Sequence, residues 1–68
     1  MKRKGLLKIS LKAARINANL TQQEVADKIK VSKHTIINWE KGKTRVGYAH
    51  LKVLSEVYDI GMEQIILC

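Results

Sequence analysis

Two helix-start signals lie close together in the middle of the chain, at Thr21 and Ser32. Thr21 precedes Glu24 by three positions, the spacing of a capping box in which each side chain bonds the backbone amide of the other residue. Ser32 can cap a second helix, with Val31 and Ile36 spaced to pack against each other across its start. The sequence therefore predicts two short helices joined by a bend of about three residues.

The flanking residues predict further helices. Ser10 can cap a helix that runs to about Ala18, and Gly42 can end the helix that follows Ser32. Apolar spacing predicts another helix over residues 48–58, and a short helical turn over residues 62–67. We therefore expect an all-α fold, a compact bundle of five short helices.

The chain has 68 residues, which is enough for one domain and one core. We expect a basic N-terminal arm, flexible or extended, over residues 1–9 and a folded domain over residues 10–68. Cys68 is the single cysteine, so no disulfide framework is expected, and a reducing cytoplasm is the expected compartment. No apolar run approaches the length of a membrane span.

The formal net charge is +7, and the basic residues are concentrated before the first acidic residue, Glu24. The residues concerned are Lys2, Arg3, Lys4, Lys8, Lys12 and Arg15. Such a balance favours a polyanionic partner, either nucleic acid or an anionic membrane surface, although a basic tail can also be only a solubility feature. The membrane is the weaker alternative, because the alternating apolar stretch near the start is short and has no aromatic anchor.

The helix predicted after Ser32 has two different faces when its residues are placed at about 100° each. The arc with the large apolar side chains is expected to face the core, and it contains Thr35, Ile36, Trp39 and Glu40. The opposite arc is polar and cationic and contains Lys33, His34, Ile37, Asn38 and Lys41. These side chains suit base edges in the major groove of DNA, since Lys can donate to guanine, Asn can pair with adenine and Ile can touch a thymine methyl. A solvated face with one stray Ile is the alternative interpretation.

Gln22 lies in the first turn of the helix that Thr21 caps. The unpaired amides and the positive dipole end at such a position favour a phosphate oxygen. Gln22 is accordingly a candidate phosphate contact, and an ordinary polar surface residue is the alternative.

The segment LTQQEVADKIKVSKHTIINWEKGK, residues 20–43, resembles the helix-turn-helix of the phage repressor and Cro superfamily, also called the xenobiotic-response-element family. A weaker match extends from Ser10 to Ile66. The resemblance implies a lambda-repressor-like bundle and a sequence-specific transcriptional regulator, typically a repressor, encoded by a bacterium or phage. It also implies base contacts by Lys33, His34 and Asn38, to which the outward arc adds Ile37, and DNA backbone contacts by Gln22, Thr35, Lys43 and Arg45, to which the same arc adds Lys41.

The family often pairs an arginine of the first helix with a glutamate near the end of the third, which here implies an ion pair of Arg15 with Glu40. The alternative is that both side chains reach solvent. Two positions depart from the family pattern. Lys30 replaces the usual Gly of the bend and must adopt a left-handed conformation or distort the turn. The loop KGKTRVGYAH lacks the usual Pro, which leaves the DNA contact of Arg45 open.

No catalytic or metal site is expected. His34 and His50 have no Cys, Asp or Glu at ligand spacing, and no phosphate loop, nucleophile with a base, or paired carboxylates are present. The sequence therefore favours a binding protein without a cofactor or metal.

The expected partner is double-stranded DNA with a near-palindromic operator, bound by a homodimer whose recognition helices lie about 34 Å apart. Dimerisation could use the fourth helix and the C-terminal turn, through Val57, Ile66 or Leu67, or pairing of the alternating segment from Leu7 to Leu11. An antitoxin or adaptor that binds a protein, and DNA only for autoregulation, is the alternative function.

Overall fold

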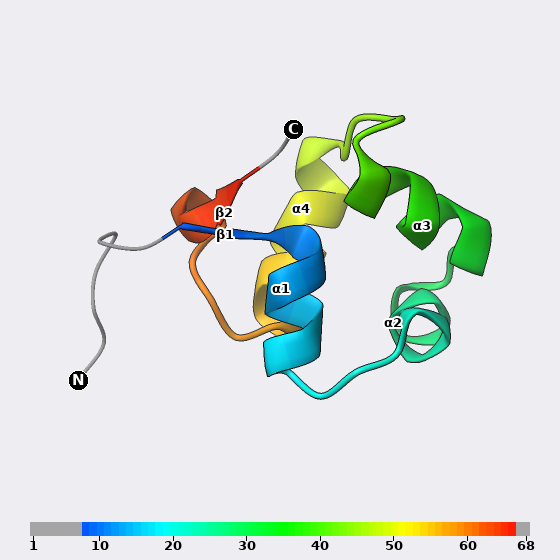
Figure 1. The fold of residues 1–68 in the computed structure, drawn as a ribbon, viewed down its shortest axis with the longest axis horizontal. Helices are drawn as coiled ribbons and strands as arrows, with labels where there is room; N and C mark the ends of the chain where they lie inside the picture. Colours follow the sequence, from blue (N-terminus) through cyan, green and yellow to red (C-terminus); the bar gives the residue numbers. More distant parts are fainter. Residues whose placement is uncertain (1–7, 67–68) are drawn as a thin grey trace.

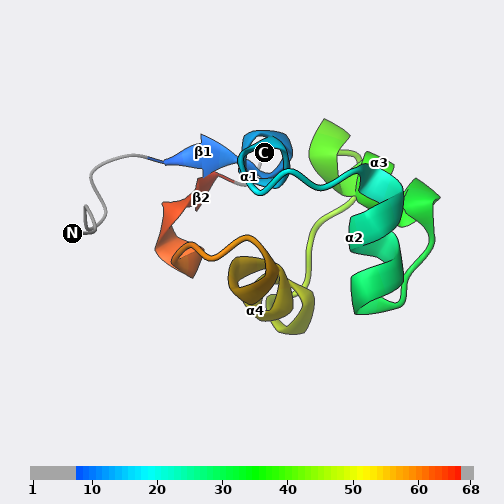
Figure 2. The ribbon, with the colours of Figure 1, turned by 90° about the horizontal axis from the view of Figure 1, so that it is seen from below.

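The computed structural model describes residues 8–66 of the chain (Figure 1). Its elements, in chain order, are β1 (Ile9–Ser10), α1 (Leu11–Asn17), α2 (Gln22–Ile29), α3 (Lys33–Lys41), α4 (Tyr48–Val57), the 3-10 turn η1 (Met62–Gln64) and β2 (Ile65–Ile66). α1 and α4 form two layers, with α2 and α3 at one end of the molecule and the strands at the other (Figure 2). The predicted all-α class is confirmed.

The predicted count of five helices is wrong, because four α-helices are found in residues 8–66. The segment expected to form the fifth is a 3-10 turn followed by a strand. β2 pairs with β1 in parallel, with Ile9 opposite Ile65 and Ser10 opposite Ile66. The Ile65 side chain is buried in the core. Extended pairing therefore satisfies the backbone and still buries this apolar residue, so a further helical turn is not needed.

The three predicted N-caps are confirmed. The Ser10 hydroxyl accepts a bond from the amide of Ala13, and the Ser32 hydroxyl accepts one from the amide of Thr35. At α2 the capping box is complete: the Glu24 amide donates to Thr21 Oγ1 at 3.0 Å, and the Thr21 amide donates to Glu24 Oε1 at 2.8 Å. These bonds satisfy amides that have no partner within the helix, and so they fix where each helix begins.

The bend between α2 and α3 is made by Lys30 in the left-handed conformation, with φ of 60° and ψ of 48°. The left-handed conformation keeps the turn tight, but for a residue with a Cβ it lowers the stability of the fold by about 1 kcal/mol. Gly42 ends α3 at φ of 77°, a region where glycine has no such cost. Each of the two helices of the helix-turn-helix segment, α2 and α3, thus ends at a left-handed residue.

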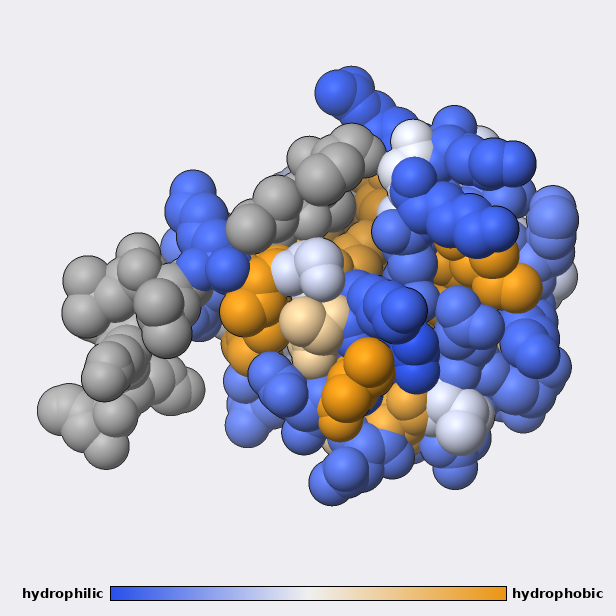
Figure 3. All heavy atoms as spheres, in the orientation of Figure 1, coloured by the Kyte–Doolittle hydropathy of each residue, from blue (hydrophilic) through white to orange (hydrophobic). Residues whose placement is uncertain are grey.

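The core lies between all four helices and reaches the strands. Its most deeply buried large side chains are Val25 of α2, Ile36 of α3 and Leu54 of α4. Polar side chains cover much of the surface seen in Figure 3, with separate apolar patches between them. Within residues 8–66, no helix combines the length and apolar character needed to span a bilayer.

Candidate nucleic-acid interface

α3 has one buried and one accessible side. Ile36 is 1% exposed and Trp39 is 9% exposed, so these two side chains attach the helix to the core. On the other side Lys33, His34 and Lys41 are exposed, and Ile37 and Asn38 are half-buried. The helix therefore presents cations, an imidazole, an amide and one branched apolar group together.

Thr35 lies beside the cap of α3 and is half-buried. Its Oγ1 lies 3.0 Å from the Ser32 hydroxyl, with which it shares a hydrogen bond. The Thr35 hydroxyl is therefore held at the first turn of α3, where the backbone amides also point outward.

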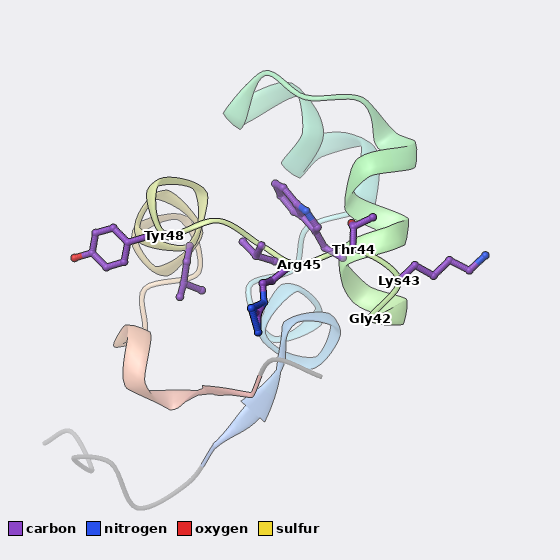
Figure 4. A pocket seen from close by; sticks show the side chains of 8 residues that line it. Gly42, Lys43, Thr44, Arg45 and Tyr48 are labelled. Carbon is purple, nitrogen blue, oxygen red and sulfur yellow. The ribbon is translucent and has the colours of Figure 1, made fainter.

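The loop between α3 and α4 carries further cations. Lys43 and Arg45 are exposed, whereas Val46 is buried and anchors the loop to the core. Beneath the loop lies a cavity of about 590 Å³, lined by Trp39, Gly42, Lys43, Thr44, Arg45, Val46, Tyr48 and Leu51. Figure 4 shows Lys43 extending away from it on the side of α3 and Tyr48 extending away on the side of α4.

The indole of Trp39 also contacts the imidazole of His50, a contact that the sequence analysis does not predict. The His50 ring lies 5.1 Å from the Trp39 ring, centroid to centroid, at an interplanar angle of 49°. The two residues belong to different helices, so no local spacing in the sequence signals the contact. The exposed His50 ring therefore packs against a buried aromatic residue of the core.

Arg15 and Glu40 are brought together between α1 and α3. Arg15 Nε donates to Glu40 Oε2 at 2.7 Å, and Nη2 donates to Oε1 at 3.3 Å. The side chains are only 11% and 5% exposed, respectively. The third donor, Nη1, bonds the carbonyl oxygen of Leu20 at 2.9 Å, in the connection to α2. The pair thus joins α1, α3 and the chain leading into α2.

Two pKa values are raised at this ion pair, those of Arg15 and of the nearby Tyr58. The hydrogen bonds that Arg15 donates to Glu40 raise the pKa of Arg15 above its ordinary value, against the opposing effect of burial. Burial, together with the negative charge of Glu40, raises the pKa of Tyr58 to about 12. Arg15 therefore stays charged and Tyr58 stays neutral through the physiological range.

The sequence predicts that Gln22 contacts a DNA phosphate; in the structure its side chain is hydrogen-bonded to Glu40. Its Nε2 donates to Glu40 Oε1 at 3.0 Å, and the residue is half-buried. Sequence reasoning missed this bond, since the residues lie on different helices. The structure thus divides the candidate residues into three places: Gln22 at the ion pair, the outward side of α3, and the loop with Lys43 and Arg45.

Metal binding finds no support in the part of the chain that the structure describes. No three His, Cys, Asp or Glu side chains in residues 8–66 come together as ligands. The chemistry available on α3 and its loop is hydrogen bonding and charge.

A short helix, a tight left-handed bend and a second helix with an accessible polar side define a helix-turn-helix domain. The helix-turn-helix family model matches residues 11–65, and the chain belongs to this family, in its Cro/C1-type form. The predicted resemblance is confirmed, and the family is one of DNA-binding transcription regulators. The searches of curated proteins and of solved structures found no match.

Proposed function

We propose that this protein is a sequence-specific repressor that reads the major groove with the outward side of α3. The observation that carries the proposal is the division of α3 into two sides. Because Ile36 and Trp39 are buried, the opposite side of the same helix stays accessible to a ligand. An α-helix fits the major groove of B-DNA, where each base pair presents a distinct pattern of donors and acceptors.

The base contacts are assigned by chemistry. Asn38 can pair bidentately with an adenine, Lys33 can donate to a guanine, and Ile37 can cover a thymine methyl group. His34 lies in the first turn of α3, where side chains of a recognition helix come nearest to the bases. These four residues would carry the sequence preference.

The phosphate contacts surround this reading side. Thr35 stands at the first turn of α3 and Lys41 at its last turn, while Lys43 and Arg45 continue the cationic surface into the loop. Gln22 adds a contact from the start of α2. Contacts of this kind fix the position of the protein on the duplex without reading its sequence.

We further propose that two copies bind a near-palindromic operator in the cytoplasm of a bacterium, with the gene of bacterial or phage origin. Val57 is half-buried against the core, and β1 is already paired with β2 of the same chain. The exposed side of α4, where Tyr48 is 71% and Val53 is 39% exposed, offers apolar area for the second copy. Of the dimer contacts expected from the sequence, Leu7 and Leu67 lie outside the residues that the structure describes.

Selection from a pool of random duplexes tests the proposal directly. A sequence-specific dimer enriches one motif with two related halves, whose centres lie about one helical turn apart. Binding to that motif should weaken with salt at a slope of about 0.9 per phosphate neutralised. Equal retention of all duplexes would contradict sequence reading, and a motif without symmetry would contradict the dimer.

A further inference from the structure

The bond between Gln22 and Glu40 links the first residue of α2 to the last part of α3. Glu40 Oε1 accepts from Gln22 Nε2 at 3.0 Å, while the same carboxylate is held by Arg15 at 2.7 Å. The carboxylate is 5% exposed, so the Gln22 amide is attached to a fixed and nearly buried anion.

The charge of Glu40 determines the direction of the Gln22 amide. A carboxylate only accepts hydrogen bonds, so it must face the nitrogen of the amide and not its oxygen. The amide nitrogen carries two protons and gives one to Glu40, so the second remains available to another acceptor. An amide in this orientation offers a donor, as a phosphate oxygen requires.

The backbone around Gln22 points to the same acceptor. The capping box occupies the amides of Thr21 and Glu24. No acceptor for the backbone amide of Gln22 is found among residues 8–66, and the adjoining Leu20 carbonyl is held by Arg15. The start of α2 therefore combines a fixed position, an unpaired backbone donor and an oriented side-chain donor.

We propose that the Arg15–Glu40 pair positions Gln22 to bind a DNA phosphate. Glu40 is a positioning residue: it touches no DNA itself and acts by orienting the Gln22 amide. The inference rests on the proposed function, since the phosphate belongs to the duplex read by α3. It also gives the pair a task beyond stability, which a buried ion pair by itself often does not improve.

The neighbouring Gln23 provides a matched control. Its Nε2 also donates to a carboxylate at 3.0 Å, but the acceptor is Asp27 of the same helix and the bond is exposed. Chemistry and bond length are the same at the two positions. Only Gln22 is connected to the ion pair.

The test is a double-mutant cycle on DNA affinity, measured on the enriched duplex and on a random one, well below the melting temperature. We expect Gln22→Met to weaken both complexes by about tenfold, the value of one hydrogen bond to a charged group. In the Glu40→Gln background the same change should cost less than about twofold. The Gln23→Met change should have an equal effect in both backgrounds.

Several outcomes overturn the inference. The first is that Gln22→Met lowers DNA affinity by the same factor in the native and the Glu40→Gln backgrounds, because the two residues then act independently. The second is that Gln22→Met does not lower DNA affinity in the native background. Failure of the proposed function looks different, because the native protein then prefers no duplex, while the coupling on random DNA can still be measured.

Glu40→Gln can fail to fold, which circular dichroism would show, and a second measurement then decides. In the native ¹⁵N-labelled chain without DNA, the side-chain amide protons of Gln22 should exchange with solvent about tenfold more slowly than those of Gln23. On addition of DNA, the side-chain amide resonances of Gln22 should shift strongly and those of Gln23 should not. Equal exchange and equal shifts for the two residues would overturn the inference without any variant.

Discussion

The two sides of α3 differ in what they do for the molecule. The inward side holds Ile36 and Trp39 in the core and places Glu40 on Arg15. The outward side holds exposed cations and the half-buried Asn38. The inner side of this short helix therefore stabilises the fold, while its outer side stays accessible to the partner that we propose. Substitutions should separate these two tasks.

The largest effect is expected on the inner side. Arg15→Ala removes the partner of a nearly buried carboxylate, which should lower the free energy of unfolding by about 3 to 5 kcal/mol. Urea unfolding measures the loss. Lys12→Ala, at an exposed position of the same helix, is the matched control and should change stability by less than about 0.5 kcal/mol. Equal effects of the two substitutions would show that the pair contributes nothing.

On the outer side, Asn38→Ala should change specificity and not stability. Losing a bidentate contact should cost about 1 to 3 kcal/mol at one base pair and little at the others. Competition between the enriched duplex and its single-base variants measures this pattern. Asn17→Ala, at an exposed position of α1, controls for a generic loss of amide. The same loss on every duplex would remove Asn38 from the base readers.

Alkaline pH should lower the stability of the core beside the inner side of α3, where Tyr58 of the α4 end interacts with Glu40 and Arg15. The pKa of Tyr58 is about 12 in the folded protein against an ordinary value of 10.0, so the native state keeps its phenol proton to higher pH. The stability that this proton provides is complete below pH 10 and is lost as the pH rises towards 12. The expected loss at pH 11 is about 1.4 kcal/mol. Melting temperatures at pH 9 and pH 11 measure it.

Two phenylalanine variants sharpen that measurement. Tyr58→Phe removes the ionisable group and should reduce the difference in melting temperature between the two pH values. Tyr48→Phe changes an exposed tyrosine and should leave the difference as it is in the native protein. If Tyr58→Phe leaves the difference in melting temperature between pH 9 and pH 11 unchanged, the loss of stability at alkaline pH comes from a group other than Tyr58.

The smallest effect is expected at the bend that sets the angle of α3. Lys30→Gly should raise the free energy of unfolding by about 1 kcal/mol, because glycine adopts the left-handed conformation without the clash of a Cβ. Lys28→Gly, within α2, should lower it by about 1 kcal/mol. Unfolding in urea compares the two, and a loss of stability in both would contradict the strain at Lys30.

The candidate site could be approached from the sequence only in part. The position of Trp39 and Ile36 on one arc of α3 follows from helical geometry, and the same geometry assigns Lys33 and Lys41 to the opposite arc. The pairing of Arg15 with Glu40 came from family resemblance, because no periodicity connects residues of different helices. The bond of Gln22 to Glu40 and the contact of His50 with Trp39 were not foreseen for the same reason.

The sequence by itself determined the starts of α1, α2 and α3, and the end of α3 at Gly42. Each depends on groups within about four residues of one another, so the local chain contains all the partners. Only the tertiary structure decided that Ile65 lies in a strand opposite Ile9 and that Gln22 is held by Glu40. Those bonds form between segments that meet only when the core assembles, since burial of apolar surface is non-directional and brings together residues that no local pattern relates.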